Sequence, residues 1–115
     1  MIYEELEGTI HRIRVGHFNL HLQLFHRENS LALILIYGAR GDQDTRQFLA
    51  GIENLINLSL ESGIEADKIY DCLLFQRGES FGVTGNPKVP MALGILDAIG
   101  KLLKYNYPEG KKREA

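Results

Sequence analysis

Residues 81–90, FGVTGNPKVP, combine residue types that shape a backbone with residue types that bind anions. Gly82 and Gly85 can adopt positive φ angles and let a ligand approach the main chain closely. Three side chains in this stretch offer a hydroxyl, an amide and a cation: Thr84, Asn86 and Lys88. The stretch therefore predicts either a pocket for a phosphate or a nucleotide, or a connector that only turns the chain.

A helical pattern follows this stretch, and Pro90 suits the first turn of a helix because that position needs no backbone N–H. Free N–H groups and the helix dipole favour an anion beside such a start. Arg77 lies upstream and can pair with a phosphate, while Phe75 or Phe81 can stack a base. We expect these side chains to complete the ligand site, with Asn86 reading the base edge or a ribose hydroxyl.

Arg40 and Arg46 form a second candidate anion site, because they flank the predicted start of a long helix. Arg46 in a first helical turn opposes the helix dipole, which favours acidic residues there. The arginine therefore either serves a bound phosphate or carboxylate, or pairs with Asp42 or Asp44 on the surface.

Few residues are arranged for catalysis or metal binding. Cys72 is the only cysteine, so no internal disulfide and no cysteine-based zinc site can form, and we expect a buried structural thiol. His17 and His21 lie in a predicted strand, where four residues span about 13 Å, too far for one ion. No nucleophile elbow, Walker loop or dinucleotide fingerprint is present. We predict a protein that is not an enzyme and has no metal or cofactor.

Length and composition predict one soluble domain. The 115 residues are 44% hydrophobic and 24% charged, as is typical of globular proteins, with a net charge of −2. This charge argues against nucleic-acid binding, which needs a basic surface. The apolar run at 31–37, LALILIY, is too short to span a membrane, and no signal peptide is evident. We expect a cytoplasmic protein with one domain over 1–107 and a charged flexible tail over 108–115.

Three strands are expected in the first third of the chain. Residues 9–15, TIHRIRV, mix β-branched and basic side chains. From Phe18 to Leu24 apolar and polar residues alternate, which indicates a half-buried strand. LALILIY suits a strand buried on both faces. The pattern predicts a hairpin or a three-stranded meander with residues 31–37 as the central strand.

Three helices are expected next. The first is capped by Asp42 or Asp44, ends at Gly63 and has one apolar face: Phe48, Ile52, Leu55, Ile56 and Ser59. The second, at about 65–74, turns three residues inward: Ile69, Cys72 and Leu73. The third begins at Pro90 and has five core positions: Met91, Ile95, Ala98, Ile99 and Leu102.

This order predicts an α+β fold, in which an antiparallel three-stranded sheet precedes two or three helices packed on one face. LALILIY is too apolar to leave the other sheet face exposed. We therefore expect a homodimer or a higher symmetric assembly, with ligand pockets shared between chains.

The run from Gly82 to Pro90, GVTGNPKVP, followed by an Ile/Leu-rich helix, resembles the C-terminal region of adenosylcobalamin-dependent ribonucleotide reductases, one of the small domains called TSCPD. The resemblance covers roughly residues 12–105. Family members named for the Thr-Ser-Cys-Pro-Asp motif have a cysteine where this chain has Asn86, so no metal or redox role of that cysteine is expected. The reductase barrel and its redox-active cysteine tail have no counterpart in these residues, and we expect no ribonucleotide reduction by this chain alone.

The resemblance and the loop composition leave three functions open. A free-standing domain can sequester a nucleotide or a nucleotide-derived messenger of antiviral immunity, as small viral anti-defence proteins do. One such protein, which captures a cyclic ADP-ribose variant, is similar in element order. The domain can instead be an accessory piece that docks on a ribonucleotide reductase, or a structural oligomer without a ligand.

Overall fold

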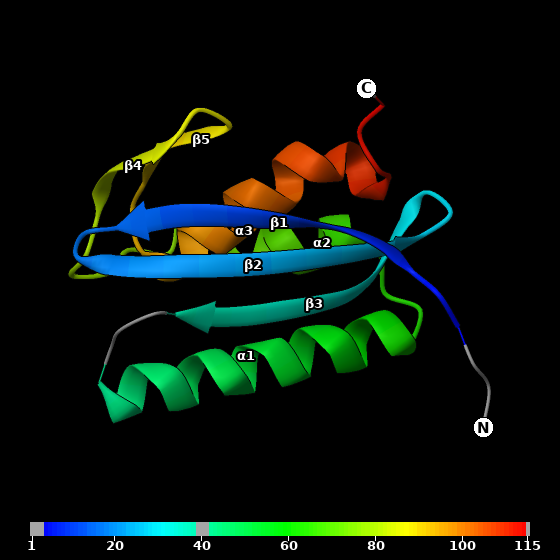
Figure 1. The fold of residues 1–115 in the computed structure, drawn as a ribbon, viewed down its shortest axis with the longest axis horizontal. Helices are drawn as coiled ribbons and strands as arrows, with labels where there is room; N and C mark the ends of the chain where they lie inside the picture. The colour runs from blue at the N-terminus through cyan, green and yellow to red at the C-terminus, as the bar shows by residue number, and fades with distance from the viewer. Residues whose placement is uncertain (1–3, 39–41, 115) are drawn as a thin grey trace.

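Alternating apolar and polar residues build a three-stranded antiparallel sheet (Figure 1). The computed structural model describes residues 4–38 and 42–114 and places β1 at Glu7–Val15, β2 at Phe18–Arg27 and β3 at Ser30–Gly38. The α+β prediction is confirmed. The prediction of a central strand at 31–37 is wrong, because the order is β1-β2-β3 and β2 lies in the middle.

The long helix α1, Gln43–Glu61, runs beside β3 and covers the edge of the sheet (Figure 1). The backbone N–H of Ile34 donates to Asn57 Oδ1 at 2.8 Å, and Asn57 Nδ2 donates back to the Ile34 carbonyl at 2.9 Å. The N–H of Ile36 donates to Glu53 Oε1 at 2.7 Å. An apolar strand can therefore lie at this edge, because helix side chains satisfy its outer hydrogen-bonding groups.

Helices α2, Ala66–Leu73, and α3, Ile95–Asn106, lie behind the sheet in Figure 1. They bury the inner side chains of β2 and β3 in a core whose most enclosed members are Leu20, Leu22, Leu24, Ile34, Ile99, Leu102 and Leu103. No described helix covers the front face of the sheet. The helices therefore leave an open sheet surface on which a site can form.

The buried side of α1 differs from the predicted one. Leu49 and Ile56 are buried, whereas Phe48 is 46% exposed and Leu55 is 62% exposed. The helix packs along a strand edge and so buries a narrow stripe of its apolar arc. Of the two caps predicted for this helix, Asp42 and Asp44, the structure has Asp42 as the N-cap. Its Oδ1 accepts the Thr45 N–H at 2.7 Å.

Cys72 is exposed, which corrects the prediction of a buried thiol. The inward positions of α2 are Ala66, Ile69, Tyr70 and Leu73. Their spacing of three and four residues defines one helical face, and Cys72 lies off it.

The segment before α3 is a β-hairpin, so the prediction of a helix from Pro90 is wrong. Strand β4, Gly82–Asn86, pairs antiparallel with β5, Val89–Ala92, and α3 starts only at Ile95. Met91 is 53% exposed in β5 instead of buried in a helix. Pro90 fits this position because it is exposed and is not among the paired residues of the ribbon, so its missing N–H costs little.

The C-terminal segment, predicted as a flexible tail, makes defined contacts in the structure. A single 3-10 turn, η1, spans Pro108–Gly110. The N–H of Lys112 donates to the Asn29 carbonyl and that of Arg113 to the Asn106 carbonyl, both at 2.7 Å. Residues 111–113 therefore close over the β2–β3 turn and the end of α3.

Candidate functional site

The β4–β5 hairpin lies along β1, on the sheet edge opposite α1 (Figure 1). Asn86 Nδ2, at the end of β4, donates to the backbone carbonyl of Arg12 at 3.0 Å. This bond joins segments that are far apart in sequence and places the glycine-rich hairpin beside the basic strand β1.

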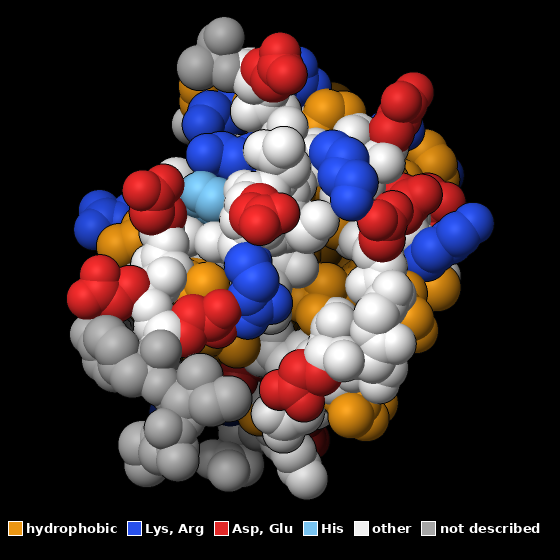
Figure 2. All heavy atoms as spheres, turned by 90° about the vertical axis from the view of Figure 1, so that its right-hand side faces the viewer, with side chains coloured by type: hydrophobic (Ala, Val, Ile, Leu, Met, Phe, Trp, Pro, Cys, Tyr) orange, Lys and Arg blue, Asp and Glu red, His pale blue; other side chains and the backbone are white. Residues whose placement is uncertain are grey.

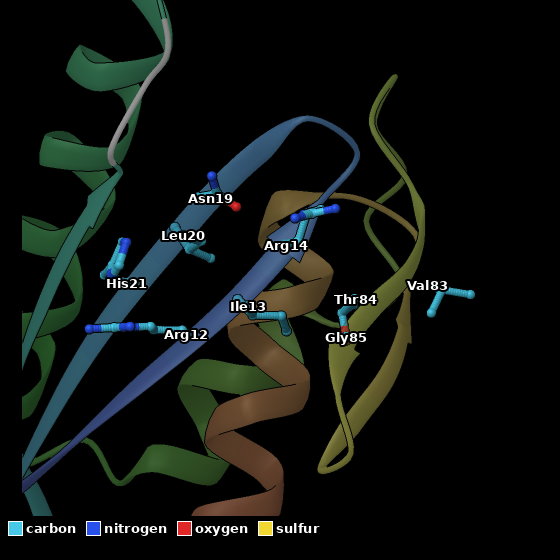
Figure 3. Close-up of a pocket in the computed structure, with 9 residues that line it drawn as sticks. All are labelled: Arg12, Ile13, Arg14, Asn19, Leu20, His21, Val83, Thr84 and Gly85. Atoms are coloured by element: carbon cyan, nitrogen blue, oxygen red, sulfur yellow. The ribbon is translucent and has the colours of Figure 1, made fainter.

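A groove with a volume of about 640 Å³ lies between the hairpin and the sheet. Its lining comes from β1, β2 and β4 and contains Arg12, Ile13, Arg14, Asn19, Leu20, His21, Val83, Thr84 and Gly85. Figure 3 shows Arg12 and Arg14 projecting from β1, with Asn19 and His21 on the neighbouring strand. Asn19 is the cross-strand partner of Arg14, and His21 is that of Arg12. The alternation of β1 thus puts two guanidinium groups on the same face as an amide and an imidazole.

The groove is a region of positive charge, because Arg12 and Arg14 line it and no acidic side chain is among its described lining residues. Among the described residues, the ion pairs involve neither Arg12 nor Arg14. A smaller cavity next to it adds Lys88 and His11. Burial lowers the pKa of His11, and the positive charge of Lys88 lowers it further. Two guanidinium groups without a carboxylate partner can bind a phosphate or carboxylate of a ligand.

The opposite end of the molecule has a different charge pattern. Figure 2 shows acidic and basic side chains interspersed there. Arg27 pairs with Glu4 at 2.6 Å and Lys111 with Glu65 at 2.8 Å. Arg27 and Lys111 at that end are therefore neutralised within the chain, whereas no such ion pair is seen for Arg12 and Arg14 at the groove among the described residues.

An aromatic surface adjoins the arginines. The rings of His21 and Tyr37 stack with their centroids 5.5 Å apart and their planes 2° from parallel. Arg12, His21 and Tyr37 form one row across the three strands. A planar base can therefore stack in this row while its phosphate reaches the arginines.

The predicted hairpin residues have divided roles. The Thr84 hydroxyl is buried and donates to the Val89 carbonyl, and the Asn86 side-chain oxygen accepts the Lys88 N–H at 2.9 Å. These groups brace the turn. Gly82 and Gly85 have φ angles of +123° and +76°, as predicted, and a side chain at either would be strained.

A carboxylate of the chain itself lies beside the start of α3. The chain's own Asp97 carboxylate is fully buried there and accepts the N–H groups of Phe75 at 2.7 Å and Leu93 at 2.8 Å. Lys101 Nζ pairs with it at 2.8 Å. Burial raises the pKa of Asp97, but these bonds outweigh that effect and hold the pKa below its ordinary value. The carboxylate therefore occupies N–H groups that precede α3, whereas Gly94, Ile95 and Leu96 at the helix start line a separate cavity that also contains Arg77.

The predicted cations and aromatic residues lie apart from the groove. Arg46 is exposed on α1, and no ion pair with Asp42 or Asp44 is seen among the described residues.

Arg77 lines a separate cavity with Thr45, Phe48 and Glu79. Phe75 and Phe81 are 69% and 66% exposed and do not line the groove. Arg40 lies outside the described residues. Of the site residues predicted from the sequence, the structure therefore places Thr84 and Gly85 in the lining of the groove, beside strand β1. The predicted arginines and phenylalanines lie elsewhere or outside the described residues.

Sequence reasoning missed Arg12 and Arg14 as site residues. The available signal was their alternation with Ile13 and Val15 in TIHRIRV, which puts both arginines on one strand face. The sequence did not show that a hairpin from residues 82–92 would lie against that strand.

Comparisons of the chain with protein-family models, with curated proteins and with solved structures found no match. The resemblance to TSCPD domains therefore stays a prediction. Among the described residues, no group of three His, Cys, Asp or Glu side chains is placed to hold a metal ion. No helix in the described ranges is long and apolar enough to cross a membrane.

Proposed function

We propose that this protein is a non-catalytic binding protein for a nucleotide or a nucleotide-derived signalling molecule, bound in the groove between the sheet and the β4–β5 hairpin. The observation that carries the proposal is the pair Arg12 and Arg14, which line this groove with no acidic side chain among the described lining residues. Each guanidinium can form two parallel hydrogen bonds to a phosphate.

The neighbouring groups support a nucleotide rather than a bare phosphate. The stacked pair of His21 and Tyr37 leaves only its outer ring faces for a base, and it lies in the same row as Arg12. Asn19 adds an amide that can read a polar edge. The described lining residues include no carboxylate, thiol or serine, the Thr84 hydroxyl donates to the Val89 carbonyl, and the His21 ring stacks on Tyr37. This lining favours retention of a ligand over its chemical conversion.

This function fits the sequestration of a cyclic nucleotide messenger in the cytoplasm, as an anti-defence protein would perform it. Sequestration needs tight, stoichiometric binding and no turnover. Arginine forks, backbone groups and an aromatic face provide binding of that kind.

A second candidate function is docking on a ribonucleotide reductase as an accessory domain. It is favoured by the face of the sheet that carries Arg12 and His21, where Ile10 is 61% exposed and Tyr37 is 46% exposed. Apolar residues gathered on an open face are typical of protein contacts.

The test begins with a thermal-shift screen of nucleotides, cyclic dinucleotides and cyclic ADP-ribose forms, since a tight ligand raises the melting temperature by mass action. Calorimetric titration of a hit should then show that Arg12→Gln and Arg14→Gln each weaken binding about tenfold or more, as expected for a lost charged hydrogen bond. Chromatography of the ligand after incubation should show no product.

Arg77→Gln is the matched control, because Arg77 lines a different cavity. It should leave the affinity unchanged. Equal losses in the Arg77 and Arg12 variants would place the ligand elsewhere. A screen without any hit, together with co-purification of a reductase, would replace the nucleotide proposal with the docking function.

A further inference from the structure

A second basic cavity is formed by β5, whereas the groove is formed by β4. It has a volume of about 440 Å³ and lies between β5, α3 and the C-terminal segment. The described residues that line it are Lys88, Val89, Pro90, Met91, Lys101, Lys104, Tyr105, Pro108 and Arg113. None of these residues lines the groove. The cavity is therefore a separate candidate site, and it does not depend on the proposed function.

Three of the four cations in this lining are seen without a carboxylate partner. Lys101 is the exception, because its Nζ pairs with the buried Asp97 carboxylate at 2.8 Å. The ion pairs of the described residues involve none of Lys88, Lys104 and Arg113. No acidic side chain is among the described lining residues. Like charges held close together repel one another, and a bound anion would relieve that repulsion.

The acidic residues that adjoin this lining in the sequence do not neutralise it. Glu109 and Glu114 are both exposed, and neither is in the described lining or in the ion pairs of the described residues. Lys111, by contrast, pairs with Glu65 at 2.8 Å. The same C-terminal segment thus contains one cation that holds the fold together and another, Arg113, whose charge is not balanced in this way.

Arg113 is held in place by its own chain. Its Nε donates to the Tyr105 carbonyl at 2.6 Å, and its backbone N–H donates to the Asn106 carbonyl at 2.7 Å. Its guanidinium carbon lies 4.3 Å from the centroid of the Tyr105 ring. The terminal nitrogens of the guanidinium remain as donors for a ligand. Because this side chain is already ordered, a ligand that it binds does not have to order it.

Two further cations reach the cavity from other elements. Lys88, in the turn between β4 and β5, places its Nζ 5.6 Å from the centroid of the same Tyr105 ring. Its backbone N–H donates to Asn86 Oδ1 at 2.9 Å, which fixes the turn that carries it. Lys104 lies in the last turn of α3, where the helix dipole favours a cation. The dipole accounts for Lys104, but it does not account for Lys88, which comes from the hairpin.

We propose that this cavity binds a diphosphate group, either as inorganic pyrophosphate or as part of a nucleoside diphosphate. A phosphate monoester carries about −1.5 to −2 charges at pH 7. Three cations without a carboxylate partner match the larger charge of a diphosphate better. The guanidinium of Arg113 suits two oxygens of one phosphate, while Lys88 and Lys104 act as point charges. The volume of about 440 Å³ falls within the range of small-ligand pockets, about 300–1,000 Å³.

Calorimetric titration of the full chain with pyrophosphate tests the proposal, in an Arg12→Gln/Arg14→Gln background so that binding in the groove does not contribute. Pyrophosphate should bind at one site per chain, about tenfold or more tighter than sulfate. Arg113→Gln in this background should weaken pyrophosphate binding about tenfold or more, as expected for a lost charged hydrogen bond. Arg113→Lys should restore only part of the affinity, because lysine lacks the planar fork.

Lys68→Gln is the matched control, because it removes one positive charge at an exposed position of α2 outside this cavity. It should leave the affinity unchanged. Arg113→Gln also removes the bond to the Tyr105 carbonyl, so Lys88→Gln provides a second variant that leaves the C-terminal segment attached. It should weaken pyrophosphate binding several-fold. Circular dichroism would show that each variant is folded.

ADP distinguishes the two sources of the diphosphate in the same background. Tighter binding of ADP than of pyrophosphate would identify a nucleoside diphosphate, and weaker binding would identify inorganic pyrophosphate. Amide NMR spectra should place the shifts caused by pyrophosphate at residues 88–91 and 104–113. An absence of pyrophosphate binding, equal affinity for sulfate, or equal losses in Lys68→Gln and Arg113→Gln would overturn the proposal. Each of these results would leave the proposed function of the groove intact, since the two linings share no residue.

Discussion

The side chain of Asn86 joins the hairpin to the sheet by donating from Nδ2 to the carbonyl oxygen of Arg12 at 3.0 Å. The residue whose backbone accepts this bond also carries one of the two guanidinium groups of the groove. The position of the hairpin and the position of the cation are therefore coupled.

Replacing Asn86 should loosen the hairpin. Asn86→Ala removes the bond to Arg12 and the bond that its side-chain oxygen accepts from the Lys88 N–H at 2.9 Å. We expect a loss of about 2 kcal/mol in the free energy of unfolding. Asn86→Asp keeps the acceptor for Lys88 but not the donor, so its loss should be smaller. Urea denaturation measures both, with Asn54→Ala on the exposed side of α1 as control; equal stability of all three variants would contradict the proposed brace.

Asn57 should matter more than its position on a helix surface suggests. Its side chain accepts the N–H of Ile34 and donates to the Ile34 carbonyl, which satisfies the outer edge of β3. Asn57→Ala leaves both groups without this partner and should cost about 2–3 kcal/mol. It should also promote aggregation, because an unpaired strand edge can pair with another chain. Denaturation and light scattering check the two effects, and a variant as stable and as monodisperse as Asn54→Ala would exclude an edge-covering role.

Asp97 should be a principal determinant of stability at the junction of α2, the hairpin and α3. Asp97→Ala leaves the N–H groups of Phe75 and Leu93 unpaired and should cost about 3 kcal/mol or more. The folded-state pKa of Asp97 is lowered, so its contribution is complete at neutral pH and is lost as pH falls through that lowered pKa, below the ordinary value of 3.8. Acid titrations of wild type and Asp97→Asn, followed by circular dichroism, should differ mainly below that value; parallel curves would argue against this assignment.

His11 should make folding stability depend on pH in the range below neutrality. Its ring is buried, its Nε2 lies 2.7 Å from Thr9 Oγ1, and its pKa is lowered from 6.5 by burial and by Lys88. The unfolded chain therefore binds a proton more readily than the folded protein, so stability is complete above about pH 7 and falls as pH drops below 6.5. Melting temperatures of His11→Gln should show less of this decline than those of the wild type. The control is His17→Gln, in the exposed turn between β1 and β2, and a decline unchanged by His11→Gln would assign the effect to another group.

Local patterns in the sequence were enough to predict much of the fold. The period-two alternation from Phe18 to Leu24 predicted β2, and Asp42 was one of the two caps predicted for α1. Each of these signals depends on neighbouring residues, because side-chain direction and capping geometry repeat over two to four positions.

Other features depend on residues that are distant in sequence. The hairpin at 82–92 has glycines and prolines that indicate a loop, and it forms where β1 and α3 pack against it. LALILIY became an edge strand because Asn57, 23 positions from Ile34, supplies the hydrogen bonds of that edge. Arg12 lines a groove because the hairpin lies beside β1, where Asn86, 74 positions away in the sequence, donates a hydrogen bond to the Arg12 carbonyl. The composition of a chain indicates that it can bind an anion. Which basic side chains line the same cavity depends on tertiary packing, because contacts between distant segments bring them together and no local sequence pattern predicts those contacts.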